Sequence, residues 1–391
     1  METEKLLIAL CRTALDGGGG DASLFASIDD ESWSMLYRLA KHHDLAHLVA
    51  EATGLLSLAP PEEIRAKLEK QSMIALYRTE QMSWELASLT AVLTEAKIPH
   101  LPLKGSVLRS YYRSPELRLS CDIDLLVRPD DLARAKETLT CKLGYTEGDV
   151  GPHDVQLYAP SGLHVELHFD LIESGFFPEA AAILADVWRY ASPVCVGSYT
   201  LCLSDEAFYF YHIAHMAKHF SFTGGCGVRP FLDLYVLYRE GKCGGDAERA
   251  RLLSSGGLAL FEEAAVGLMR VWMMECEPTA LTSSLSDFVL TGGTYGITRN
   301  RVAAERGRGK SRFRYLLARL FPPLSSMRFR FPVLKRAPIL LPLCYFLRLL
   351  SPLWSGRYRR LLREARTSGS ITEQESAEVG ELLLELGLLK G

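Results

Sequence analysis

The chain has 391 residues, of which 48% are hydrophobic and 23% are charged, and its formal net charge is -3. These values argue against a disordered or collagen-like chain, and the length predicts two or three domains or one large domain with helical additions. No uncharged apolar run reaches about 18 residues, so we expect no transmembrane helix. The first residues do not resemble a secretion signal, and the nine cysteines form no C-x-x-C pair. We therefore expect a cytoplasmic protein without a disulfide framework or a zinc ribbon.

Residues 1–96 are predicted to be helical, with apolar residues at helical spacing and a long helix that begins at Pro61. Residues 97–200 change in character: a short strand precedes a helix at 105–112, a strand at 121–127, a helix from 129 to Gly144 and a hairpin of 155–158 with 163–171. From Ser204 onward we expect helices at 204–220, 229–240, 246–276 and 281–290. The order predicts three regions, 1–96, 97–200 and 201–391, with a small α/β or α+β module in the middle.

Asp122 and Asp124 are the most informative residues of that module. They stand two apart on a predicted strand, so both side chains point to one face, while Ile123 and the residues after Asp124 are apolar. Two carboxylates at the end of a buried strand repel each other unless a cation neutralises them. The pattern predicts a divalent metal site for Mg²⁺ or Mn²⁺, and the alternative is a strand end with two solvated acids.

Two further motifs extend this arrangement. Lys104, Gly105 and Ser106 form a turn between a strand and a helix, where Gly105 would allow a phosphate to approach the backbone. On the hairpin, Glu166 shares one face with His164 and His168. A strand beside the two aspartates would bring Glu166 to a second metal ion or to an attacking hydroxyl, as phosphoryl and nucleotidyl transfer require.

These motifs together resemble a known family. The order Leu103-Lys104-Gly105, then Arg118 with Asp122 to Val127, then Val165-Glu166-Leu167-His168 is similar to a bacterial uncharacterised nucleotidyltransferase family of the DNA polymerase beta-type superfamily. The likeness extends from the Trp33–His43 helix to Gly292-Gly293-Thr294-Tyr295-Gly296. It implies an α+β fold, in which a small mixed-sheet nucleotidyltransferase core is embedded in a mostly helical body. It also implies transfer of NMP from an NTP.

The resemblance also suggests roles for the residues. Asp122, Asp124 and Glu166 would be the catalytic and metal-binding acids, with Glu166 at the second metal ion or acting as base. Gly105 and Ser106 would cradle phosphate, and Lys104 would neutralise the triphosphate or remain a solvated lysine beside a turn. Arg118 would contact the γ-phosphate or pin its loop to an acid.

A histidine-bearing helix follows. His212, His215 and His219 share one helix face, and with Asp233 they could form a zinc site. We favour instead a polar face that lines the nucleotide cleft, with His215 and His219 against substrate and Arg229 and Asp233 paired nearby; core packing is the other alternative. His42, His43 and His47 are assigned to helix-surface or inter-domain polar contacts.

The C-terminal part is strongly basic. Residues 297–366 contain 18 Lys and Arg against two acids, Glu305 and Glu364, so the rest of the chain carries about -19. The segment interleaves cations and aromatic residues, which suits RNA, and it contains amphipathic stretches, which suit an anionic membrane surface. It could also pack against the acidic body. The cation-aromatic pattern rests on Arg312, Phe313, Arg314, Tyr315, Arg319, Arg328, Phe329 and Arg330.

The sequence therefore predicts a metal-dependent nucleotidyltransferase with NTP as substrate and an acceptor that the sequence does not identify: a protein, a tRNA or a small molecule. The alternatives are a catalytically silent RNA-binding or regulatory protein and a peripheral membrane enzyme that acts on a lipid-linked phosphate. Three clustered acids favour the enzyme, because burying them without a cation is costly.

Overall fold

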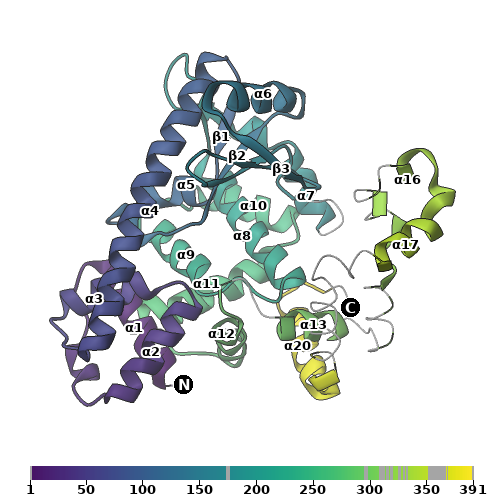
Figure 1. Ribbon diagram of the computed structural model, residues 1–391. Helices are drawn as coiled ribbons and strands as arrows, with labels where there is room; N and C mark the ends of the chain where they lie inside the picture. The colour runs from purple at the N-terminus through teal and green to yellow at the C-terminus, as the bar shows by residue number, and fades with distance from the viewer. Residues whose placement is uncertain are drawn as a thin grey trace.

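The computed structural model describes residues 2–172, 177–294, 298–307 and 369–389, together with 313, 317, 320–324, 327–328, 331, 333–350 and 367. Most of these residues are helical, and one five-stranded sheet lies among the helices (Figure 1). The expectation of an α+β protein with a small mixed sheet in a mostly helical body is confirmed. The division at residues 97 and 201 stays a prediction.

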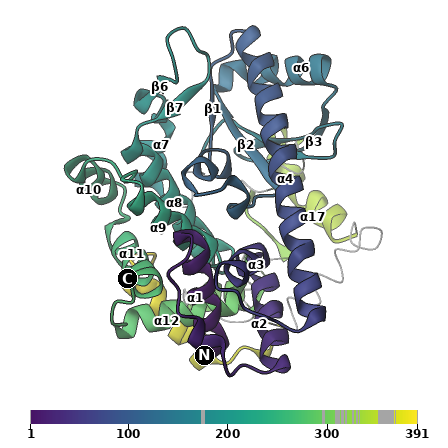
Figure 2. The same ribbon diagram turned by 90° about the vertical axis from the view of Figure 1, so that its left-hand side faces the viewer.

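The N-terminal part is helical, as expected. Helices α1 (Glu2–Asp16), α2 (Asp30–His42) and α3 (Ala46–Leu55) pack together, and α2 and α3 pack against the 34-residue helix α4 (Glu62–Glu95). Glu62 and Glu63 occupy the first turn of α4, where carboxylates interact favourably with free backbone N–H groups. Helix α4 extends from the N-terminal helices to the sheet and connects the two parts (Figures 1 and 2).

The sheet contains parallel and antiparallel pairs. Its strands are β1 (His100–Pro102), β2 (Asp122–Val127), β3 (Thr146–Val150), β4 (Asp154–Tyr158) and β5 (His164–His168). Their order is β1-β2-β5-β4-β3, and β2 pairs with β5 in parallel while the other pairs are antiparallel. The predicted strand at 121–127 and the predicted hairpin are confirmed. Strand β3 was not predicted, and all five of its residues are exposed.

One face of the sheet is apolar and packs on helices. Ile123, Leu125 and Val165 are fully buried against residues of α4 and of α6 (Leu132–Leu143). Burial of each such side chain contributes about 1.5–3 kcal/mol to stability. Because side chains alternate along a strand, this packing directs the intervening residues, Asp122 and Asp124 among them, to the opposite face.

The C-terminal helices differ from the expectation in one place. Helix α8 (Asp205–Phe222) begins at Ser204, whose hydroxyl caps it as predicted, and α9 (Arg229–Arg239) and α12 (Ala280–Gly292) lie close to their expected positions. The single helix expected at 246–276 is wrong. It is two helices, α10 (Asp246–Ser255) and α11 (Ala259–Met274), because Gly257 adopts a φ of +68°, which a helix does not accommodate.

Several small elements were not predicted. They are α7 (Pro178–Ala185) and a two-stranded sheet of β6 (Ala191–Pro193) and β7 (Leu201–Leu203). The helix expected at 105–112 is shorter, since α5 (Gly105–Leu108) gives way to a 3-10 turn over Arg109–Tyr111. None of the helices in the described ranges combines the length and apolarity that crossing a bilayer requires.

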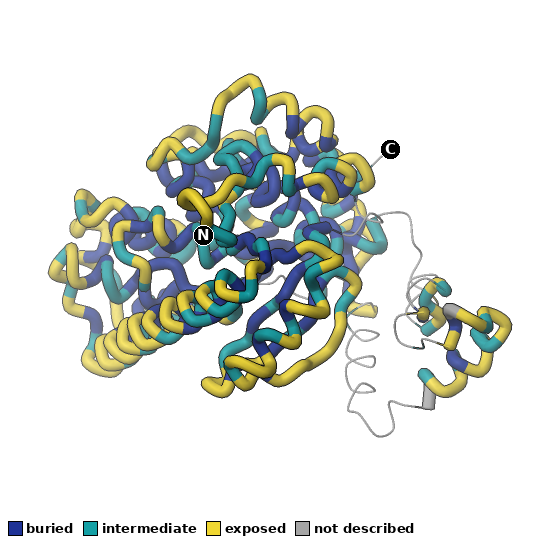
Figure 3. Tube along the Cα trace, turned by 90° about the horizontal axis from the view of Figure 1, so that it is seen from above, coloured by how far each residue is buried: buried dark blue, intermediate teal, exposed yellow. Residues whose placement is uncertain are grey.

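The basic C-terminal part has two described pieces. Helix α13 (Thr298–Gly307) packs on α20 (Glu373–Glu385), where Arg299 forms an ion pair with Glu375 and Arg306 donates to the carbonyl of Ile371. This piece also contacts the body, α13 at α8 and α20 at α12, as one alternative held. Helices α16 (Val333–Arg336) and α17 (Leu341–Leu350) lie apart from the main body (Figures 1 and 3). Arg312, Arg314, Tyr315, Arg319, Phe329 and Arg330 lie outside the described residues, as do Tyr295 and Gly296.

Candidate functional site

The register of the parallel strand pair assembles the site. Asp122 lies opposite His164, Asp124 opposite Glu166, and Leu126 opposite His168. Side chains at paired positions of neighbouring strands point to the same face, so two aspartates, one glutamate and two histidines share the face that the helices α4 and α6 leave free. The expected positions of Glu166 beside the aspartates and of His164 and His168 on its face are confirmed.

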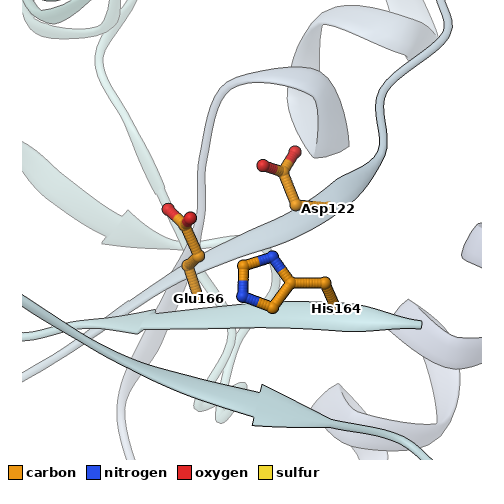
Figure 4. Close-up of side chains that lie close together, drawn as sticks. All are labelled: Asp122, His164 and Glu166. Atoms are coloured by element: carbon orange, nitrogen blue, oxygen red, sulfur yellow. The ribbon is translucent and has the colours of Figure 1, made fainter. Parts of the chain in front are cut away.

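Asp122, His164 and Glu166 form the first cluster. One ligand atom from each lies within 4.8 Å of those of the other two. Figure 4 shows both carboxylates on the same side of two adjacent strands, with the imidazole ring between them. Burial, with the neighbouring charge of Asp124, raises the pKa of Asp122 to about 6. The Nε2 atom of His164 is buried and has no hydrogen-bond partner.

Asp124 has a different environment. It is 3% exposed, and its Oδ1 accepts hydrogen bonds from Lys104 Nζ at 2.7 Å and from His168 Nε2 at 2.8 Å. Burial alone would raise the pKa of Asp124, but Lys104 and His168 together hold it well below its usual range. His168 Nε2 also lies 3.4 Å from Glu166 Oε2, and hydrogen bonds to both acids raise the pKa of His168 although burial opposes this. Asp124 is therefore a carboxylate that the Lys104 ammonium group and the His168 ring together hold in its ionised form.

The turn that carries Lys104 is strained. Lys104 has φ +44° and ψ -121°, a conformation that glycine adopts readily and other residues seldom adopt. Gly105 has an ordinary φ, but a Cβ atom there would lie 2.6 Å from Ser120 Oγ, so a larger residue would force Ser120 to move. The hydroxyl of Ser106 is buried and has no hydrogen-bond partner. Strain of about 1–3 kcal/mol at a site residue is typical of functional positions.

Helix α8 places basic and aromatic side chains near this turn. Burial, with the charge of Lys104 as the next cause, lowers the pKa of His219 to about 4 and that of His215 well below its ordinary value. The two rings are in contact, with 3.2 Å between their Nε2 atoms. Lys218 of the same helix lies 3.5 Å from His153 Nε2, whose ring stacks on His168. His215 and His219 thus lie on a helix face near Lys104, and their contact with a nucleotide stays a prediction.

Arg118 and Asp233 are bound to each other. The guanidinium donates to both carboxylate oxygens of Asp233, at 2.7 and 2.9 Å, and Tyr112 Oη donates to the same group at 2.6 Å. All three residues are buried. Arg118 therefore anchors its loop to an acid, which was the alternative to a contact with the γ-phosphate. The expected pair of Arg229 with Asp233 is wrong, because Arg118 takes Asp233 and Arg229 instead binds Asp44 at 2.6 Å.

The zinc alternative receives no support from the described part of the chain. His212 Nε2 lies 3.1 Å from the carbonyl of Pro230, while His215 and His219 contact each other, and no group of ligand atoms there combines them with Asp233. Two N-terminal histidines make polar contacts with distant segments, as expected. His43 Nε2 lies 2.9 Å from the carbonyl of Leu290, and His47 Nε2 lies 3.2 Å from that of Leu117.

The donor set fits a divalent cation. Asp122 and Glu166 offer carboxylate oxygens, the preferred ligands of Mg²⁺ and Mn²⁺, and a ring nitrogen of His164 is the third donor of the same group. Asp124, Glu166 and His168 form a second group whose ligand atoms lie within 4.8 Å of one another. Lys104 and His168 already bind Asp124, so the group of Asp122, His164 and Glu166 is the better candidate for metal binding.

Sequence reasoning missed part of the site. It placed His164 and His168 on the correct face without giving either a role, and it did not identify His153 or Lys218. The alternation of Val165-Glu166-Leu167-His168 contained the signal for His168, because a period of two directs every second residue to the acids. Nothing local indicated Lys218, whose neighbour His153 is 65 residues away.

A cavity of about 820 Å³ lies elsewhere, lined by residues of α8 to α12, among them Tyr209, Glu262 and Arg270. None of the residues predicted for the site lines it. The chemistry of the polar sheet face, and not this volume, therefore identifies the candidate site.

Comparison with known proteins agrees with that chemistry. Residues 29–274 match the family described as uncharacterised nucleotidyltransferase. The matched range contains every residue predicted for the site and ends before the Gly292–Gly293 stretch. No curated protein matches the chain significantly, and neither does any solved structure. The match covers more than half of the chain, from α2 to α11, so the protein belongs to the uncharacterised nucleotidyltransferase family and is an enzyme of that class.

Proposed function

We propose that the enzyme moves NMP from an NTP to a hydroxyl or phosphate of an acceptor, in a metal-dependent reaction on the polar face of the sheet. The acceptor classes are a protein, a tRNA and a small molecule. The observation that supports this best is the parallel register of β2 and β5, which puts Asp122, Asp124 and Glu166 on one face. A core of the DNA polymerase beta type would have three strand-borne carboxylates of this kind.

Asp122, Glu166 and His164 would hold the metal ion, with Asp124 available once Lys104 releases it. A bound Mg²⁺ or Mn²⁺ would neutralise charge on the triphosphate and on the reacting oxygens. In the transfer, the acceptor oxygen bonds to the α-phosphorus, the bond to the β-phosphate oxygen breaks and pyrophosphate leaves. Glu166 is placed to accept the proton of an acceptor hydroxyl, or to bind a second metal ion instead.

Other residues of the chain would bind and orient the nucleotide. Lys104 would exchange Asp124 for a phosphate oxygen, and the unpartnered hydroxyl of Ser106 beside Gly105 would donate to phosphate. His215 and His219 would contact the nucleotide from α8. Arg118, Asp233 and Arg229 take a positioning role in this proposal, because their charges are already paired within the protein.

The test is the release of pyrophosphate and the transfer of label from an α-³²P-labelled NTP with Mg²⁺ or Mn²⁺. Each of the four NTPs is offered with three acceptor pools: total protein, tRNA and small-molecule extract. We expect label in one pool, dependent on metal and absent with the Asp122→Asn, Asp124→Asn double variant. Label that the double variant transfers equally well would remove the site from the mechanism.

A further inference from the structure

The described residues between 320 and 350 form a small unit of their own. Within its described residues, Met327, Leu334 and Cys344 are buried together and form a cluster separate from the main core. Tyr345 Oη donates to the carbonyl of Pro322 at 2.6 Å, and Arg348 donates to that of Leu320 at 2.7 Å. Figures 1 and 3 show α16 and α17 set apart from the rest of the molecule. We call these residues the 320–350 unit.

The outer face of this unit is apolar. Ile339, Leu343, Phe346 and Leu347 are 87%, 53%, 59% and 47% exposed. Leu343, Phe346 and Leu347 follow Ile339 by four, seven and eight residues, so the four side chains lie on one side of α17 and of the turn before it. The opposite side, with the buried Cys344, packs into the unit. An apolar stripe that faces away from its own core indicates an interaction surface.

The charged residues in the sequence of this unit are all cationic. The unit contains five cationic residues, Arg328, Arg330, Lys335, Arg336 and Arg348, and the sequence contains no Asp or Glu between Glu305 and Glu364. Arg328 and Arg336 are exposed. Because the chain outside residues 297–366 carries about -19, an anionic surface would attract this region and repel the rest of the protein.

We propose that the 320–350 unit docks on the surface of an anionic phospholipid bilayer. The apolar stripe would enter the boundary between head groups and acyl chains, and the exposed Arg328 and Arg336 of the same unit would contact lipid phosphates. Three of the four stripe residues are aliphatic, which suits acyl chains, whereas single-stranded RNA needs aromatic rings for stacking. The ten described residues of α17 span about 15 Å and include Arg348, and the proposal places them in the interface. This inference does not depend on the proposed nucleotidyl transfer.

Flotation of the full-length protein with vesicles tests it. We expect binding to vesicles of phosphatidylcholine with phosphatidylglycerol and binding at least roughly tenfold weaker to pure phosphatidylcholine. The triple variant Leu343→Ser, Phe346→Ser, Leu347→Ser should lose about tenfold or more in partitioning, since it removes apolar area without touching the core. Each of Arg328→Gln and Arg336→Gln should lose up to about fivefold.

A matched control comes from helix α4. Met73, Tyr77 and Trp84 are 73%, 69% and 66% exposed there, so the triple serine variant at these positions removes similar exposed area from another surface. Unchanged flotation of this control supports the proposal. The proposal is overturned if wild type does not bind anionic vesicles, or if the α17 variant binds them as wild type does. It is also overturned if both vesicle types bind equally, or if the α17 variant instead loses binding of a labelled single-stranded RNA.

Discussion

The Nζ atom of Lys104 lies 2.7 Å from Oδ1 of Asp124, so the second aspartate of the pair already has a cation from its own chain. The first aspartate, Asp122, has no such contact, and its pKa is raised to about 6 by burial and by Asp124. The two carboxylates therefore have different environments although the sequence presents them as equivalent. The predictions below use that difference.

Lys104→Met should destabilise the protein without metal by up to about 3–5 kcal/mol, because it leaves the buried Asp124 carboxylate with His168 as its remaining partner. The same variant should gain more stability from Mn²⁺ than wild type does, since the metal ion no longer competes with an ammonium group. Urea unfolding with and without Mn²⁺ measures both effects. Lys136→Met, which breaks the more exposed pair with Glu147, serves as the control and should cost at most about 1 kcal/mol. A smaller metal effect in Lys104→Met than in wild type would contradict this account.

Asp122→Asn should stabilise the metal-free protein at pH 8 by about 1–3 kcal/mol. The pKa of Asp122 is about 6 in the folded protein, above its value in the unfolded chain. Ionisation of Asp122 therefore lowers the free energy of unfolding fully above about pH 6, and this loss of stability disappears below the pKa of the unfolded chain. The gain of the variant should therefore shrink as the pH falls from 7 to 4. Denaturant unfolding at several pH values checks this, and a gain that grows toward acid pH would contradict it.

The sequence predicted the elements whose signal is local. The pattern of Asp122-Ile123-Asp124 identified a strand with one polar face, and Ser204 marked the start of α8. It did not predict the contacts that give each acid its environment. Arg118 and Asp233 are 115 residues apart, and His168 is 44 residues from Asp124, so only the packing of α9 and the pairing of β2 with β5 bring them together. The exposed strand β3, Thr146–Val150, has no apolar alternation that could indicate it.

Glu166→Gln should lose turnover by about 10²-fold or more and NTP binding far less, because the amide oxygen still offers the metal ion a ligand but does not accept the acceptor proton. Nucleotide affinity and single-turnover transfer, measured on the same preparation, separate the two effects. Glu147→Gln on the exposed strand β3 is the matched control and should behave as wild type. Turnover at the wild-type rate in Glu166→Gln would make Glu166 a structural residue.

His164→Ala should weaken Mn²⁺ binding more than Mg²⁺ binding. Imidazole nitrogen is a better ligand for transition metals than for Mg²⁺, which prefers oxygen. Titration of each metal by calorimetry gives the two affinities, and His42→Ala, at an exposed position of α2, is the control. Equal losses for both metals would indicate that His164 does not ligate the metal and supports the carboxylates in another way.

The most direct test of the metal-dependent nucleotide site is thermal stability with each of the four NTPs, with and without Mg²⁺ or Mn²⁺. A ligand that binds only the folded protein raises Tm according to its occupancy. The account predicts a rise with at least one NTP that requires the metal and disappears in the Asp122→Asn, Asp124→Asn double variant. A rise of the same size without metal, or one that the double variant retains, would contradict it.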